Sequence, residues 1–166
     1  KFIRTEGFLV EQQMGKSMWA GLMERTGSSM LPGWGAQGGI KDSSSTDIIV
    51  HGGEPLSTFY QCGEGYQLDP YTLETQNKAS WVPSGGLSAH PKVDLATGEL
   101  LFFNYSKHAP FLNYGVVDKN KNLNHFIPVE LPGPRLPHDM AFSKNYSIIN
   151  DLPLFWDQEM LKKGIH

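Results

Sequence analysis

The fold class of this chain is decided by the stretch Lys92-Val93-Asp94-Leu95-Ala96-Thr97-Gly98-Glu99-Leu100. It runs from apolar residues through an aspartate and a polar turn to a leucine. The segments 67–73 and 116–123 repeat this order, and their aspartates, Asp69, Asp94 and Asp118, lie 25 and 24 residues apart. Such spacing and turn chemistry are typical of successive β-hairpins. Two hairpins make a four-stranded blade of roughly 40–50 residues, the repeating unit of a β-propeller.

The composition agrees with a loop-rich, mostly β protein. The 166 residues include 18 glycines and 11 prolines, and the formal net charge is -3 without a basic cluster. A nucleic-acid partner is therefore not expected. No apolar run approaches the roughly 20 residues that a membrane-spanning segment requires. The single cysteine, Cys62, cannot form an internal disulfide, which favours a reducing compartment and a cytoplasmic location.

The N-terminal part has a different texture from the rest of the chain. Thr5 and Glu6 suit the N-cap and first turn of a helix, and apolar residues recur at helical spacing, which predicts a helix over residues 5–25. A Gly-, Ser- and Pro-rich loop is predicted over residues 27–47. It contains a GxGxxG pattern, but no strand precedes it, so a dinucleotide site is not inferred. Residues 1–46 are thus a helix and loop lead-in, and residues 47–166 are the blades.

Two histidines each stand at the head of a predicted hairpin. His90 precedes the hairpin of residues 92–105, and His138 precedes the hairpin of residues 140–149. They lie 48 residues apart, which equals two hairpin periods, or one blade. Equivalent positions on successive blades converge on the central axis, where two imidazoles can share a metal such as Fe, Zn or Cu. Spacing alone leaves open that each imidazole merely caps its strand by bonding a backbone carbonyl.

The segments around both histidines resemble motifs of the carotenoid cleavage oxygenases, a family that includes retinal pigment epithelial membrane proteins and lignostilbene dioxygenases. The similar segments are residues 51–75, Leu87-Ser88-Ala89-His90-Pro91-Lys92-Val93-Asp94, residues 131–143 from Leu131-Pro132-Gly133-Pro134-Arg135-Leu136-Pro137-His138-Asp139 onward, and residues 151–157. They span nearly the whole chain in the family's order. The resemblance implies an all-β fold, about three blades of a seven-bladed propeller, with a short N-terminal helix.

The resemblance also implies a metal site. The family holds Fe(2+) with four histidines and no carboxylate ligand, and His90 and His138 match two of the four. The other two ligands would lie beyond His166, so we expect the chain to be part of a longer protein and to be inactive alone. The family places a glutamate beside a ligand histidine, and Glu64 matches it, with His138 as its expected partner. Such a carboxylate fixes the tautomer and orientation of the imidazole.

The implied reaction is cleavage of a C=C double bond by an Fe(II)-dependent dioxygenase. The expected partners are O2 and a small hydrophobic conjugated substrate, a carotenoid, apocarotenoid or stilbene-like molecule, held in an apolar tunnel and giving two carbonyl products. No catalytic residue beyond the metal ligands is expected. Stilbene-cleaving members resemble one another in carrying a lysine just before the glutamate, where this chain has Gly63. That departure disfavours a phenolic stilbene and favours a polyene.

Two other kinds of protein remain compatible with the residues. A zinc hydrolase on a β scaffold needs a carboxylate near the histidine pair, and Asp139 is its only candidate. A metal-free propeller that acts as an interaction module would not need the two histidines at all. Peripheral contact of the whole protein with a membrane and the oligomeric state stay open.

Overall fold

The architecture comes from a computed structural model that describes residues 1–20, 29–30, 41–60, 62–155, 157, 159–160 and 163. Strands β1 (Asp47–His51), β2 (Glu54–Thr58), β3 (Tyr66–Leu68) and β4 (Thr75–Lys78) form a four-stranded antiparallel sheet in that order. We call this sheet blade one. Strands β5 (Lys92–Val93), β6 (Leu100–Tyr105), β7 (Leu112–Val117) and β8 (Leu123–Pro128) form blade two in the same way. Strands β9 (Met140–Phe142) and β10 (Ser147–Ile149) pair as hairpin three.

The repeated aspartates lie in the turns that join these strands. Asp69 accepts hydrogen bonds from the amides of Tyr71 and Thr72 in the β3–β4 turn. Asp94 accepts from Ala96 between β5 and β6, and Asp118 accepts from the amides of residues 120 and 122 between β7 and β8. An aspartate that bonds the backbone two residues later is the physical basis of its preference for turns. The predicted hairpins are therefore confirmed at all three repeats.

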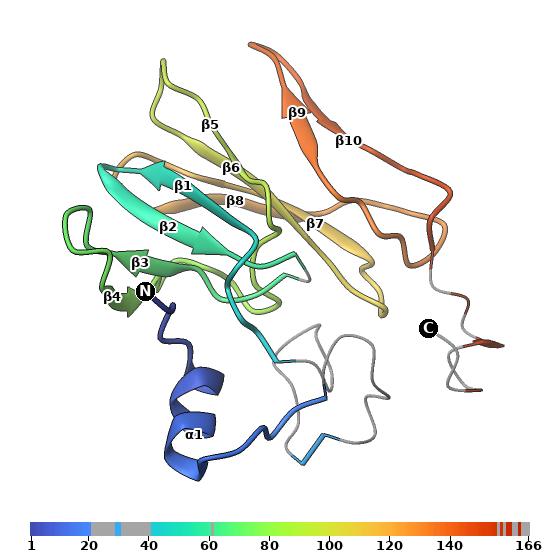
Figure 1. Cartoon of the computed structure of the whole chain (residues 1–166). Coiled ribbons are helices and arrows are strands. Elements are labelled where there is room, and N and C mark those ends of the chain that lie inside the picture. Colours follow the sequence, from blue (N-terminus) through green and yellow to red (C-terminus); the bar gives the residue numbers. More distant parts are fainter. Residues whose placement is uncertain are drawn as a thin grey trace.

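The first strand of each unit contacts the first strand of the next unit. β1 lies against β5, and β5 lies against β9, so consecutive sheets are arranged side by side around a common line (Figure 1). This is the arrangement of inner strands in a β-propeller. The prediction of a mostly β fold with a short N-terminal helix is confirmed. The inner strands are β1, β5 and β9, and the division at residues 46 and 47 stays a prediction.

The core lies between neighbouring sheets. One buried cluster joins blades one and two through Leu56, Ala79, Leu87, Leu100, Phe102 and Val117. A second joins blade two to hairpin three through Cys62, Phe103, Tyr105, Leu112 and Met140. Phe102 and Phe103 are adjacent on β6 and fully buried, and they point to opposite faces because side chains alternate along a strand. Gly115 faces Phe102 so closely that any Cβ there would overlap the ring. Blade two is thus packed on both faces.

The N-terminal helix is shorter than the sequence predicts. Helix α1 runs over Glu6–Met14, with the Thr5 hydroxyl accepting the amide of Phe8 as an N-cap. It ends at Gly15, which has a left-handed φ of 67° and terminates the helix as glycine commonly does. Met18 and Trp19 are buried but lie outside the helix. The helical spacing of these apolar residues therefore reflected their burial and not a longer helix. The rest of the predicted helix and the GxGxxG pattern fall outside the described residues.

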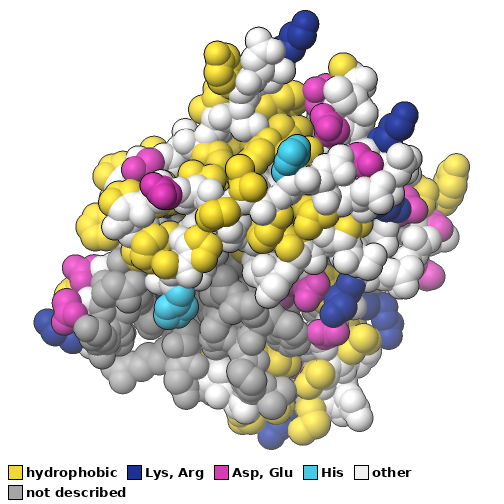
Figure 2. Space-filling view, turned by 180° about the vertical axis from the view of Figure 1, so that it is seen from behind, with side chains coloured by type: hydrophobic (Ala, Val, Ile, Leu, Met, Phe, Trp, Pro, Cys, Tyr) yellow, Lys and Arg dark blue, Asp and Glu magenta, His cyan; other side chains and the backbone are white. Residues whose placement is uncertain are grey.

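Large apolar side chains also reach the surface of this part of the molecule. On β1, Ile48 and Val50 are 57% and 60% exposed, whereas Ile49 between them packs on the core shared with blade two. Ile48 and Val50 therefore point away from blade two. Figure 2 shows hydrophobic side chains gathered across the face seen from behind. Exposed apolar surface of this extent is typical of contacts with other protein elements or ligands. No helix in the described ranges combines the length and apolarity needed to cross a membrane.

Candidate metal centre

Both predicted histidines lie just before an inner strand. His90 precedes β5 by two residues and His138 precedes β9 by two residues. Each has a buried proline as chain neighbour, Pro91 after His90 and Pro137 before His138. Proline fixes its own φ and restricts the residue before it to extended conformations. Pro91 therefore restricts the backbone of His90 to extended conformations, whereas Pro137 fixes only its own φ in front of His138.

The structure brings the two imidazoles together. Their ring centroids lie 5.1 Å apart, with an angle of 55° between the ring planes. Two imidazoles that bind one metal at about 2.1 Å, at angles of roughly 90–110° to each other, place their centroids about 4.5–5.3 Å apart. The observed separation falls within that range. The pair thus fits a shared metal ion, and neutral imidazole is a good donor for iron, zinc or copper.

An acidic residue that the sequence analysis missed holds His90. The Nδ1 atom of His90 lies 2.9 Å from Oδ2 of Asp47, the first residue of β1 in the neighbouring blade. An ionised carboxylate can only accept, so Nδ1 carries the proton and Nε2 is the nitrogen left for a metal. The signal was present in the sequence, because Asp47 opens the first predicted strand run. It could have been found by comparing the heads of all inner strands.

The neighbour of His138 is also tied to the adjacent blade. Lys92, the first residue of β5, donates from Nζ to Oδ1 of Asp139 at 2.6 Å, and the Met140 amide donates to the same oxygen at 2.7 Å. Burial pushes the pKa of Asp139 upward, but these hydrogen bonds and the charge of Lys92 outweigh it, so the pKa lies below its usual value. The Asp139 carboxylate is thus engaged by Lys92, which weakens the zinc hydrolase alternative that needed it.

Glu64 lies in a different environment from the one expected of it. Its carboxylate is 3.8 Å from Nζ of Lys78, and within the described part of the chain no hydrogen bond joins it to His138. The structure therefore does not bring this predicted pair together, and a role of Glu64 beside the metal stays a prediction. Its amide donates to buried Asp42 at 3.0 Å. Burial raises the pKa of Asp42 to about 6, against the hydrogen bonds from the amides of Ser44 and Glu64.

Asp42 also explains the glycine at position 63. A Cβ at Gly63 would overlap the carboxylate of Asp42, so no side chain fits there without moving that buried group. The amide and carbonyl of Gly63 both bond Leu87, at 3.2 and 3.0 Å, which fixes its backbone in place. In this chain, position 63 therefore has no room for a side chain beside Asp42.

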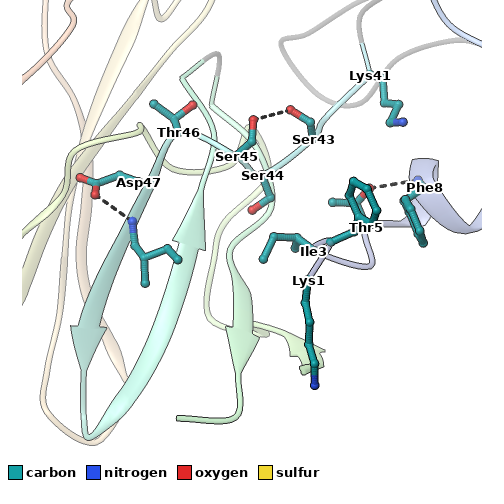
Figure 3. A pocket seen from close by; sticks show the side chains of 12 residues that line it. Lys1, Ile3, Thr5, Phe8, Lys41, Ser43, Ser44, Ser45, Thr46 and Asp47 are labelled. Carbon is teal, nitrogen blue, oxygen red and sulfur yellow. Dashed lines mark hydrogen bonds between the residues drawn. The ribbon is translucent and has the colours of Figure 1, made fainter. Parts of the chain in front are cut away.

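A cavity of about 540 Å³ lies beside the N-terminal end of β1 (Figure 3). The side chains of Ile3, Phe8 and Ile48 give it apolar walls, and the hydroxyls of residues 43–46 line another part. Asp47 lies at its edge, so the cavity reaches the residue that bonds His90. Across the described residues no cluster of three or more His, Cys, Asp or Glu side chains forms a metal site. Neither His90 nor His138 lines the cavity, so Asp47 is the residue that connects it with the histidine pair.

The comparisons with known proteins show the family to which this chain belongs. The family model described as retinal pigment epithelial membrane protein matches residues 1–166, and the chain belongs to this family of carotenoid cleavage oxygenases, which use a non-haem metal. The isoeugenol monooxygenase of Pseudomonas nitroreducens is 32% identical over 92% of this chain and 32% of its own length. A carotenoid 9,10(9',10')-cleavage dioxygenase 1 of Phaseolus vulgaris is 40% identical over 72% of this chain and 23% of its own length.

The likeness extends to a solved structure. The lignostilbene dioxygenase of Pseudomonas brassicacearum superposes with a TM-score of 0.81 at 27% identity, over 99% of this chain and 34% of that one. The family's seven-bladed propeller fold is thereby shown for the part that this chain contains. The chain spans no more than about a third of the length of these relatives.

Proposed function

We propose that this chain supplies His90 and His138 as two of the four histidine ligands of an Fe(II)-dependent oxygenase that cleaves a C=C bond with O2. The observation that carries the proposal is the 5.1 Å separation of the two rings at the heads of successive inner strands. Family membership over residues 1–166 supports the reaction class. We assign the other two ligands to the longer protein, because this chain spans about a third of the length of its relatives.

The contribution of these residues to the reaction is to hold and shape the site. Iron, when bound, supplies the activation of O2 that no side chain can provide. His90 and His138 are neutral donors, so they leave the full positive charge on the ion. The Asp47 carboxylate orients His90, and the Lys92–Asp139 pair fixes the backbone beside His138. In the overall reaction one C=C bond and the O–O bond break, and two C=O bonds form.

The substrate that the site favours is a polyene such as an apocarotenoid. The resemblance implies a lysine at position 63 in stilbene-cleaving members, whereas this chain has Gly63 with Asp42 filling the space beside it. The cavity beside β1 offers apolar walls from Ile3, Phe8 and Ile48. An elongated hydrocarbon is held by apolar walls and needs no cationic anchor. A phenylpropene, the substrate class named by the monooxygenase relative, is the second candidate, because that relative matches 92% of this chain.

The experiment uses the longer protein that contains this chain, loaded with Fe(II) and supplied with an apocarotenoid in air. We expect two carbonyl products, one iron per chain, and no turnover without O2. Zinc with hydrolytic activity would support the hydrolase, and a folded protein that binds no metal would support an interaction module. The 166-residue chain alone should bind iron weakly and lack activity, since it holds only two of the proposed ligands. A cytoplasmic location stays a prediction that fractionation of the native cells can check.

A further inference from the structure

The strongest unassigned feature near the histidine pair is the contact between blades one and two at Asp47. Its Oδ2 atom lies 2.9 Å from Nδ1 of His90. Its Oδ1 atom accepts the amide of Ile48 at 2.8 Å, the bond drawn at Asp47 in Figure 3. One oxygen is thus tied to the backbone of β1, and the other faces the imidazole. A carboxylate restrained in this way has little freedom to leave the ring.

A buried hydroxyl joins the two segments that carry this pair. Thr58 lies opposite Asp47 in the β1–β2 ladder and is fully buried. Its hydroxyl lies 2.6 Å from the carbonyl oxygen of Ala89 and 3.3 Å from that of Asp47. Ala89 immediately precedes His90. The single hydroxyl proton of Thr58 goes to the nearer carbonyl, that of Ala89, while strand pairing joins Thr58 to Asp47. Thr58 therefore ties the residue before His90 to the strand pair that carries Asp47.

We propose that Asp47 is a positioning residue for metal binding: it holds His90 in the tautomer and orientation that present Nε2 to the ion. This inference rests on the proposed function. A carboxylate that accepts the Nδ1 proton excludes the tautomer with a protonated Nε2, and it raises the electron density on Nε2. Nδ1 and Nε2 lie on different edges of the ring, so a metal on Nε2 is directed away from Asp47. Asp47 therefore acts through His90 and is not itself a ligand.

The test measures metal affinity in the longer protein, with Co(II) as a redox-stable probe that is followed by its visible absorption. Removal of such a partner typically weakens metal affinity 10–100-fold. We expect Asp47→Ala to raise the Co(II) dissociation constant by about that factor. Asp47→Asn keeps an acceptor oxygen of the same size and should give an intermediate loss with a shifted absorption band.

The matched control is Glu54→Gln. Glu54 also reaches from blade one to blade two, where its carboxylate lies 2.5 Å from Nζ of Lys121, but it lies beyond the opposite end of β1. We expect this variant to bind Co(II) within about twofold of the wild-type protein, as an electrostatic contact away from the ligands should. Melting of the metal-free proteins shows whether each variant is folded.

The outcomes separate the inference from the proposed function. A wild-type protein that binds no Co(II) or Fe(II) would overturn the proposed function and this inference with it. A wild-type protein that binds metal, beside Asp47→Ala and Asp47→Asn variants with unchanged affinity and spectrum, would overturn only the role of Asp47. The role of Asp47 would also be overturned if Asp47→Ala and Glu54→Gln destabilised the metal-free protein equally and Asp47→Ala lost no more Co(II) affinity than Glu54→Gln.

Discussion

His90 and His138 occupy equivalent places at the heads of β5 and β9, yet the structure holds them differently. The side chain of His90 is 23% exposed and bonds Asp47. His138 is exposed, and in the described ranges its ring has no hydrogen-bond partner. Lys92 of the preceding inner strand β5 lies near His138, but it bonds the carboxylate of Asp139 and not the imidazole.

The difference lies in one position of the repeat. Asp47 is the first residue of β1, and Lys92 is the first residue of β5, and each reaches the head of the next inner strand. A carboxylate at this position accepts a ring proton, whereas an ammonium group would repel a charged imidazole and instead bonds the neighbouring aspartate. At this position, Asp47 therefore contacts the imidazole of His90 directly, whereas Lys92 contacts only Asp139, the residue after His138.

The largest expected effect tests whether the two histidines act as a pair in spite of this difference. His90→Ala and His138→Ala in the longer protein should each remove most of the bound iron and lower C=C cleavage by more than about 100-fold, because each leaves a ligand position empty. His125→Ala, an exposed residue on β8, is the control and should change neither. Retention of iron in His138→Ala alone would show that only the better-held histidine is a ligand.

A smaller effect is expected at the hydroxyl that ties Ala89 to Asp47. Thr58→Val keeps the shape of the buried side chain but leaves its carbonyl partners without this donor, which should lower stability by about 1–3 kcal/mol. Thermal unfolding measures this loss. Metal affinity should fall with it, because the position of His90 depends on this contact. Thr75→Val, which alters a hydroxyl of a less buried residue, should have little effect on either quantity.

The ion pair beside His138 should matter less. Lys92 and Asp139 have side chains that are 31% and 48% exposed, so solvent weakens their attraction. Lys92→Met should cost less than about 1 kcal/mol of stability. Any accompanying rise in the Co(II) dissociation constant should be smaller than that of Asp47→Ala. A larger rise would show that the backbone contact positions its histidine as firmly as the direct one.

The smallest expected effect is at Glu64. Its carboxylate is near Lys78 and not bonded to His138, so Glu64→Gln should leave the Co(II) affinity within about twofold of wild type. A tenfold loss of affinity would instead establish the role beside His138 that the sequence resemblance implies. Titration with Co(II) under the same conditions as for Asp47→Ala makes the two carboxylates directly comparable.

The sequence predicted the features that depend on turn-forming residues and on the spacing of the repeated segments. The hairpins follow from aspartates that bond their own turns. The nearness of His90 and His138 follows from a spacing of one blade, whereas their role as metal ligands comes from the family resemblance. The helix end at Gly15 was missed because the buried residues Met18 and Trp19 continue a helical spacing without being helical. Asp47 was missed because its partner lies in another blade, and only the packing of β1 against β5 brings the two together.

The most direct test of the account is anomalous scattering at the iron edge from crystals of the longer protein grown with Fe(II). The account predicts one peak within bonding distance of a ring nitrogen of both His90 and His138, with Asp47 still bonded to Nδ1 of His90. A peak that contacts only one of the two histidines, or an iron site elsewhere in the molecule, would contradict it.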